Sequence, residues 1–115
     1  MQHDRACLLD IIEAAKLAVS YVEGGTKEAF LQSTQLQDSV IRRIEILGEA
    51  ARRISLETRA KHPDFPWNEM IGMRNLMIHK YDDVDLEVVW QTIRMDLPAL
   101  IRQIEPLTYS NQDEE

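Results

Sequence analysis

The sequence has little of several residue types, and each shortage excludes a class of protein. A lone cysteine, Cys7, cannot form an intramolecular disulfide and has no metal-site spacing around it, so we expect a small core residue. Only four glycines and four prolines occur in 115 residues, which excludes collagen-like and low-complexity chains. No apolar run approaches the roughly 20 residues that cross a bilayer, and the first residues lack the pattern of a secretion signal. We therefore expect a cytoplasmic protein without membrane contact.

Basic residues are also scarce, but they are unevenly distributed. The chain has 13 Lys and Arg against 20 Asp and Glu, a net charge of -7, which argues against a protein that coats nucleic acid through bulk electrostatics. Residues 42–61 reverse the balance, with six basic and three acidic side chains. This stretch is either a local basic surface or a solvated helix face, with Arg42 pairing with Glu45 and Glu49 with Arg53.

Apolar residues, 44% of the chain, recur at helical spacing in three long segments. These segments are residues 4–23, 40–54 and 86–104, and the last is expected to start at an Asp83 or Asp85 cap and to be kinked by Pro98. The apolar stripes consist of Leu8, Ile11, Ala15, Ala18 and Val22; of Val40, Ile44, Leu47, Ala51 and Ile54; and of Leu86, Val89, Trp90, Ile93, Leu97, Leu100 and Ile104.

Shorter signals complete the predicted topology. Gly24 and Gly25 stop the first helix, Thr26 caps a short helix over residues 27–31, and a further helix starts at Asp64 or Pro66. Gly48 allows a neighbouring backbone to approach the second long helix closely. No stretch alternates with a period of two. The sequence thus predicts an all-α antiparallel bundle of four to five helices, with one domain over residues 1–108 and a frayed acidic tail over residues 109–115.

One stretch, RNLMIHKY at residues 74–81, places polar residues inside an apolar helix. A core stripe on this helix consists of Met70, Met73 and Met77, so its apolar residues are explained by packing without any function. Asn75 and His79 are four residues apart and therefore share one face.

Arg74 lies on a different face of that helix. On an ideal helix it is about 140° from His79, so one straight helix cannot bring both to a single substrate. Either the helix ends near Ile78, or a second copy of the chain completes the site by two-fold symmetry.

Arg74 and His79 have properties that suit cleavage of an RNA phosphodiester without metal. Histidine, with an unperturbed pKa of about 6.5, can take or give a proton, and arginine is a fixed fork of donors for phosphate oxygens. In such a reaction the 2'-hydroxyl attacks the adjacent phosphorus while negative charge builds on the equatorial oxygens. The simpler alternative is a solvated arginine and a histidine bonded to a helix end.

Two neighbouring features have ordinary structural interpretations. Asp82, Asp83 and Asp85 follow His79 and could be taken for a metal site, but aspartates ahead of a helix are common N-caps, so we expect neither a metal nor any other cofactor. Trp67 and Trp90 could stack on bases, yet their apolar settings favour packing in the core or an interface.

The motif and its surroundings resemble a known family. RNLMIHKY is similar to the R-x-x-x-x-H-x-Y signature of the HepT-like branch of the HEPN superfamily, including the Asn after the Arg. The segments DSVIRRIEILGEAARRIS, PWNEMIGMRN and DLEVVWQTIRMDLPAL are also similar to what that family carries around its motif, so the resemblance covers residues 4–104.

The resemblance implies a helical, homodimeric endoribonuclease that is the toxin of a prokaryotic toxin-antitoxin pair, works without metal and has both motif copies at a shared cleft. It implies that Arg74 holds the phosphate, His79 acts as general base or acid, and Asn75 orients the cleft or the histidine. Tyr81 would accept AMP from an antitoxin that resembles a minimal nucleotidyltransferase, and the adenylate would block RNA by charge and volume. Lys80 occupies a variable position and receives no role.

Two other functions stay open at this stage. The chain could be a catalytically degenerate partner of a nucleotidyltransferase, which its acidic net charge favours. It could also be a helical interaction protein without any RNA function, for which the amphipathic helices alone are enough.

Overall fold

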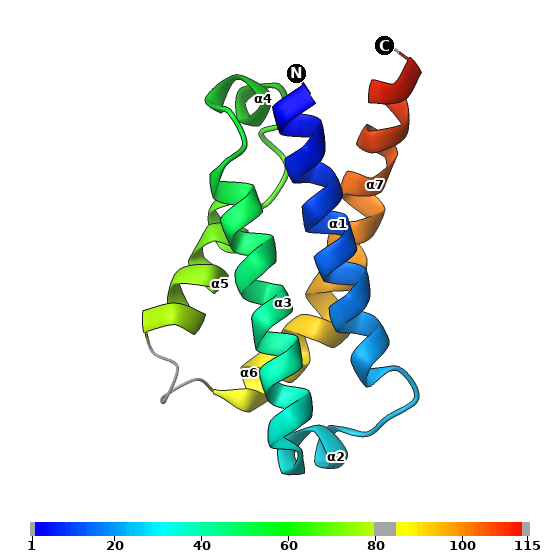
Figure 1. Ribbon diagram of the computed structural model, residues 1–115, viewed down its shortest axis with the longest axis vertical. Coiled ribbons are helices and arrows are strands. Elements are labelled where there is room, and N and C mark those ends of the chain that lie inside the picture. The colour runs from blue at the N-terminus through cyan, green and yellow to red at the C-terminus, as the bar shows by residue number, and fades with distance from the viewer. Residues whose placement is uncertain (1, 80–84, 114–115) are drawn as a thin grey trace.

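The computed structural model describes the backbone of residues 2–79 and 85–113, and the side chains of residues 3–74 and 85–109. Within these ranges the regular structure is entirely helical. Four long helices run antiparallel in an elongated bundle: α1 (Gln2–Val22), α3 (Thr34–Arg52), α5 (Trp67–His79) and α7 (Leu97–Asp113) (Figure 1). The predicted all-α antiparallel bundle is thereby confirmed.

Three short helices lie at the ends of the bundle. They are α2 (Lys27–Gln32), α4 (Leu56–Lys61) and α6 (Leu86–Gln91). In Figure 1, α2 and α6 lie at the lower end, and α4 lies at the upper end beside the N-terminus. Helix α1 packs against both α3 and α7, and α3 also packs against α5, so α5 lies at one outer edge of the bundle.

The predicted apolar stripes form two buried clusters. One joins the start of α1, the end of α3, and α5 and α7, and includes Leu8, Leu47 and Met70 at 2% exposure or less. The other joins the end of α1 with α2, the start of α3 and α6, and is centred on the fully buried Phe30. Cys7 is buried within the first cluster, which confirms its predicted role as a small core residue.

Several helix ends follow the predicted capping chemistry. The Thr26 hydroxyl accepts a hydrogen bond from the Ala29 amide at 3.1 Å, and Asp85 caps α6 by accepting from the amides of Glu87 and Val88. Gly24 has a φ of 77°, a conformation that glycine adopts without strain, directly after α1.

The short helix α4 was not predicted from the sequence. It lacks an apolar stripe, and its first residue, Leu56, is 78% exposed. Hydrogen bonds at its start hold it in place instead: the Ser55 side chain caps it, and buried Asp4 of α1 accepts from the Ser55 amide at 3.0 Å, the Ser55 hydroxyl at 2.6 Å and the Thr58 hydroxyl at 2.5 Å. These bonds attach α4 to the start of α1.

The last predicted helix is interrupted. A π-helical turn, η2 (Thr92–Asp96), separates α6 from α7, and the Leu97 amide donates to the Thr92 carbonyl five residues earlier. Pro98 has no N–H to donate to the Arg94 carbonyl, so the α-helical hydrogen-bond pattern cannot continue unchanged through this turn. The predicted effect of Pro98 therefore takes the form of a widened turn. Among the described helices, none is both long and apolar enough to cross a membrane.

Candidate active site

The motif arginine lies where α5 packs against α3. Arg74 Nε is 3.2 Å from Glu49 Oε2, and the Arg74 side chain is only 22% exposed. The second oxygen of the same carboxylate, Glu49 Oε1, accepts from Arg52 at 3.2 Å. One glutamate of α3 therefore holds two arginines, one from its own helix and one from the motif.

Gly48 makes this contact between the helices possible. A Cβ atom placed on Gly48 would lie 2.1 Å from Arg74 Cβ and 2.7 Å from the Met70 carbonyl oxygen, both too close for any residue other than glycine. The predicted close approach at Gly48 is thus confirmed, and the approaching backbone is the motif helix itself. Glu49, the next residue, is consequently placed beside Arg74.

The charges around Glu49 keep its carboxylate ionised. The hydrogen bond from Arg52, together with the positive charges of Arg52, Arg74 and Arg53, lowers the pKa of Glu49 below its ordinary value, although partial burial acts in the opposite direction. The Glu49 carboxylate therefore provides a negative charge that attracts the Arg74 guanidinium.

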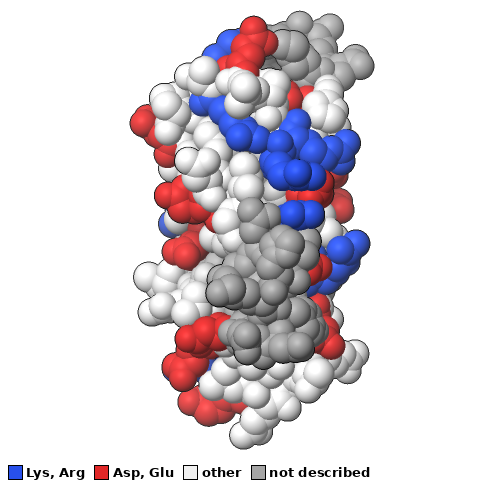
Figure 2. Space-filling model, turned by 90° about the vertical axis from the view of Figure 1, so that its left-hand side faces the viewer, with Lys and Arg blue, Asp and Glu red and all other residues white. Residues whose placement is uncertain are grey.

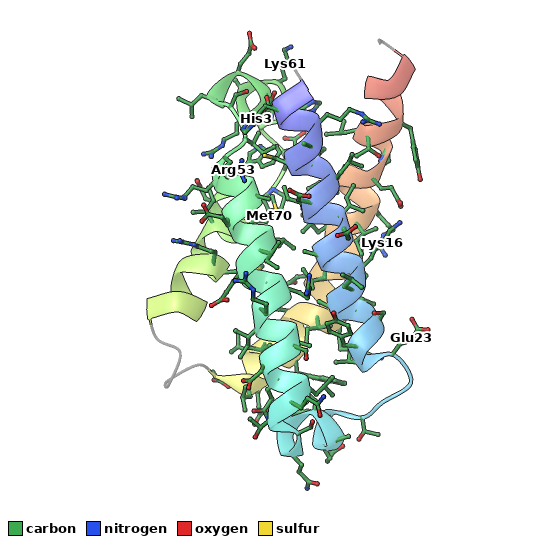
Figure 3. All side chains as sticks on the ribbon, viewed as in Figure 1. His3, Lys16, Glu23, Arg53, Lys61 and Met70 are labelled. Atoms are coloured by element: carbon green, nitrogen blue, oxygen red, sulfur yellow. The ribbon has the colours of Figure 1, made fainter. Side chains whose placement is uncertain are left out.

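The two predicted ion pairs of α3 have different outcomes. Arg42 and Glu45 do pair, with 3.5 Å between Arg42 Nη1 and Glu45 Oε1. The predicted partner of Glu49 was wrong, because Glu49 pairs with Arg52 instead of Arg53. Arg53 is the C-cap residue of α3, and its carbonyl oxygen is 3.1 Å from His3 Nε2 at the start of α1 (Figure 3).

The remaining motif residues are located only in part. Asn75 follows Arg74 in α5, and the described part of this helix extends to His79. The side chains of Asn75 and His79 lie outside the described residues, as do Lys80, Tyr81, Asp82 and Asp83 entirely. Within the described ranges, no group of three or more His, Cys, Asp or Glu residues could hold a metal ion.

Both tryptophans have packing roles, as the sequence favoured. Trp67 is 6% exposed and its Nε1 donates to the His62 carbonyl at 2.9 Å. The Trp90 ring lies against Phe30, with ring centroids 5.6 Å apart. The Arg94 guanidinium lies over the Trp90 ring, 5.4 Å from the ring centroid.

A groove of about 280 Å³ lies between α5 and α7. Apolar side chains including Met70, Met73 and Leu97 line it, together with the carboxylates of Glu69 and Asp96. These acidic groups would repel a phosphate, so the groove suits RNA less well than the arginine-bearing surface at the α3–α5 contact.

The comparison with known proteins identifies the family. The family described as Ribonuclease HepT-like matches residues 11–107. The chain belongs to the HepT-like family. No solved structure is significantly similar to it.

Among the relatives of this HepT-like chain are three proteins whose names describe them as ribonucleases by prediction. The one from Methanocaldococcus jannaschii is 36% identical over 88% of this chain and 93% of its own length. One from Thermococcus cleftensis, named as a HepT, is 40% identical over 87% of this chain and 91% of its own length. The third, from Caldanaerobacter subterraneus subsp. tengcongensis, is 33% identical over 93% of this chain and 96% of its own length.

Sequence reasoning missed two residues of the site, Glu49 and Arg52. The sequence placed both in a stretch that was either a local basic surface or a solvated helix face. The signal that could have identified Glu49 was its place directly after Gly48, the residue expected to allow a close approach. The identity of the approaching residue, Arg74, depends on how α5 packs, which no local pattern encodes.

Proposed function

We propose that this HepT-like chain is a metal-independent endoribonuclease and the toxin of a prokaryotic toxin-antitoxin pair. The observation that carries the proposal is the Arg74 guanidinium, paired with Glu49, on the helix that also carries His79. Membership of the HepT-like family and the ribonuclease names of its relatives support an RNA substrate.

In the proposed reaction, the RNA supplies its own nucleophile. His79 takes the proton of the 2'-hydroxyl, the 2'-oxygen forms a bond to the adjacent phosphorus, and the bond from phosphorus to the 5'-oxygen breaks. The leaving 5'-oxygen takes a proton from protonated His79 or from water, and the products are a 2',3'-cyclic phosphate and a 5'-hydroxyl end. Arg74 would stabilise the charge that builds on the phosphorus-bound oxygens, and Asn75 would orient the histidine or the RNA.

We further propose that the active form is a homodimer. Arg74 points toward α3, where it meets Glu49, while the helical spacing places His79 about 140° away around α5. A second copy related by two-fold symmetry would bring an arginine of one chain near a histidine of the other. Light scattering at micromolar concentration should give twice the chain mass of 13.4 kDa, and a monomeric mass would count against a shared cleft.

The antitoxin would be a minimal nucleotidyltransferase that modifies Tyr81. The Tyr81 oxygen would attack the α-phosphate of ATP and pyrophosphate would leave, so that an adenylate becomes attached beside the catalytic groups. Its phosphate would compete with RNA for Arg74, and its bulk would occlude the site.

The test is expression of wild type, Arg74→Ala, His79→Ala and Tyr81→Phe in a host that lacks any partner gene. Growth is scored, and purified RNA is incubated with each protein in chelator. Wild type and Tyr81→Phe should arrest growth and cut RNA, whereas the Arg74 and His79 variants should do neither. RNA that stays intact with unmodified wild type, across several substrates, would exclude the nuclease.

The main alternative is a catalytically degenerate partner of a nucleotidyltransferase. The net charge of -7 favours it, because an acidic protein gains little from bulk attraction to RNA. On this alternative His79→Ala would leave growth and RNA unchanged while partner binding persists.

A further inference from the structure

The surface next to Arg74 carries two more arginines that the proposed cleavage chemistry does not use. Arg52 is 56% exposed at the end of α3, and it shares the carboxylate of Glu49 with Arg74. Arg59 of α4 donates through Nη2 to the carbonyl of Arg52 at 2.8 Å and to that of Ala51 at 3.2 Å. These contacts link three arginines in order from the motif helix to α4: Arg74, Arg52 and Arg59.

Figure 2 shows this surface directly. Lys and Arg side chains gather in the upper part of this face, over the end of α3 and α4, although the chain as a whole is acidic. Glu49 is the carboxylate that contacts two of the three arginines, so the local balance stays positive. Such a patch on an acidic protein points to a localised anionic ligand instead of general attraction to nucleic acid.

Arg59 also borders a shallow hollow at the loop between α4 and α5. The hollow has a volume of about 490 Å³ and is lined further by Phe65, Asn68 and the acidic residues Asp64 and Glu69. The rings of His62 and Phe65 stack with centroids 5.2 Å apart, and the Phe65 ring also lies against Trp67 with centroids 5.6 Å apart, so the wall of the hollow contains aromatic side chains. An aromatic ring next to an arginine is how single-stranded RNA is commonly held, with the base on the ring and the phosphate on the guanidinium.

We propose that Arg52 and Arg59 bind the backbone of single-stranded RNA on one side of the cleaved phosphodiester, with a flanking base in the hollow beside Phe65. The proposal rests on the proposed ribonuclease function and adds to it the path that the RNA follows over the protein surface. The Arg59 guanidinium is already fixed by two carbonyl oxygens, so little ordering is needed on binding. Asp64 and Glu69 lie in the wall of the hollow, where a carboxylate can accept from a base amino group.

The decisive variant is Arg52→Gln, because the Arg52 side chain is exposed and its loss leaves the core intact, whereas Arg59 also stabilises the end of α3. Arg102→Gln is the matched control, since Arg102 is an exposed arginine on α7, on the other side of α1 from α3. Binding is measured with 2'-O-methyl RNA, which keeps every phosphate but has no 2'-hydroxyl to attack, as an octanucleotide and as a dinucleotide with one phosphodiester.

Wild type should bind the octanucleotide more tightly than the dinucleotide. Arg52→Gln should weaken octanucleotide binding about fivefold to tenfold and lower the slope of log K against log salt by about 0.7, the share of one phosphate contact on a single strand. It should weaken dinucleotide binding less than octanucleotide binding, and Arg102→Gln should change neither. The proposal would be overturned if wild type bound the octanucleotide and the dinucleotide with equal affinity. It would also be overturned if Arg52→Gln lowered the affinity for both RNAs equally or did not lower it at all.

A second readout reports the hollow itself. In a Trp90→Phe background, Trp67 is the sole tryptophan and lies in the wall of the hollow, so the octanucleotide should quench its fluorescence and the dinucleotide should not. Absence of quenching by a bound octanucleotide would remove the hollow from the binding path. Failure of the proposed function looks different, because wild type would then bind the octanucleotide as described and yet leave unmodified RNA uncut.

Discussion

Gly48 of α3 and Arg74 of α5 are in contact at a point where the two helices lie too close together for any side chain larger than hydrogen at residue 48. A Cβ on Gly48 would be 2.1 Å from Arg74 Cβ, so the absence of a side chain at residue 48 sets how near the motif arginine comes to α3. The Glu49–Arg74 ion pair depends on this spacing, because Glu49 follows directly in the same helix turn. The position of the candidate catalytic arginine is thus determined by a residue that cannot itself take part in the chemistry.

Gly48→Ala should therefore destabilise the fold and displace Arg74. Overpacking of a tight contact costs about 1–3 kcal/mol, which exceeds the gain of about 1 kcal/mol that alanine normally brings to a helix. The matched control is Gly72→Ala in α5, where an added Cβ would meet no described atom within 4 Å, so this variant should be as stable as wild type or more stable. Urea unfolding measures both, and a Gly48→Ala protein as stable as Gly72→Ala would contradict the tight contact.

Glu49→Gln should separate the binding of RNA from the rate of its cleavage. Without the negative charge, Arg52 and Arg74 attract phosphate more strongly, so KM should fall. The Arg74 guanidinium also loses its oriented partner, and since a partly exposed ion pair contributes up to about 1 kcal/mol, kcat should fall roughly fivefold.

Glu45→Gln is the matched control for this variant. Glu45 lies one turn earlier on α3 and pairs with Arg42, away from Arg74, so its loss should leave both constants unchanged. Steady-state kinetics on a defined RNA distinguish the two variants. An unchanged kcat for Glu49→Gln would mean that Glu49 does not orient Arg74.

Much of the fold follows from periodic apolar residues, because burial of one helix face is a local pattern repeated every three or four positions. The stripe of α1, from Leu8 to Val22, and the stripe that runs from Val40 in α3 to Ile54 just after this helix are buried as predicted. Helix α4 has no such stripe and depends on hydrogen bonds to Asp4, more than 50 residues earlier in the chain, so no sequence window contains its cause.

The candidate site divides in the same way. Arg74 and His79 can be recognised from the sequence because one short segment contains both residues at the spacing that resembles the family motif. Glu49 and Arg52 belong to the site only through the packing of α5 on α3, and their local pattern is that of an ordinary salt-bridged helix. The ion pair of Glu49 with Arg53 was a reasonable prediction from spacing, but Arg53 is the C-cap residue, where the chain leaves the helix.

The bonds from α4 to Asp4 predict a specific response to acid. Burial opposes ionisation of the Asp4 carboxyl, but the hydrogen bonds from Ser55 and Thr58 outweigh it, and the pKa of Asp4 lies below its ordinary value. A carboxyl whose pKa is lower in the folded than in the unfolded chain stabilises the fold above the unfolded pKa of about 3.9, and this contribution is lost as the pH falls through the lower folded value.

Asp4→Asn should consequently lower the free energy of unfolding by about 1–3 kcal/mol at pH 7, since it weakens hydrogen bonds to a buried charge. The control Asp10→Asn changes an exposed aspartate of the same helix and should have little effect. In acid, wild type loses the stability that the ionised Asp4 provides, whereas Asp4→Asn has no such contribution to lose. The difference in free energy of unfolding between the two proteins should therefore be smaller when urea unfolding is measured at pH 3. A difference of equal size at pH 7 and pH 3 would show that the ionised carboxylate is not what holds α4 to α1.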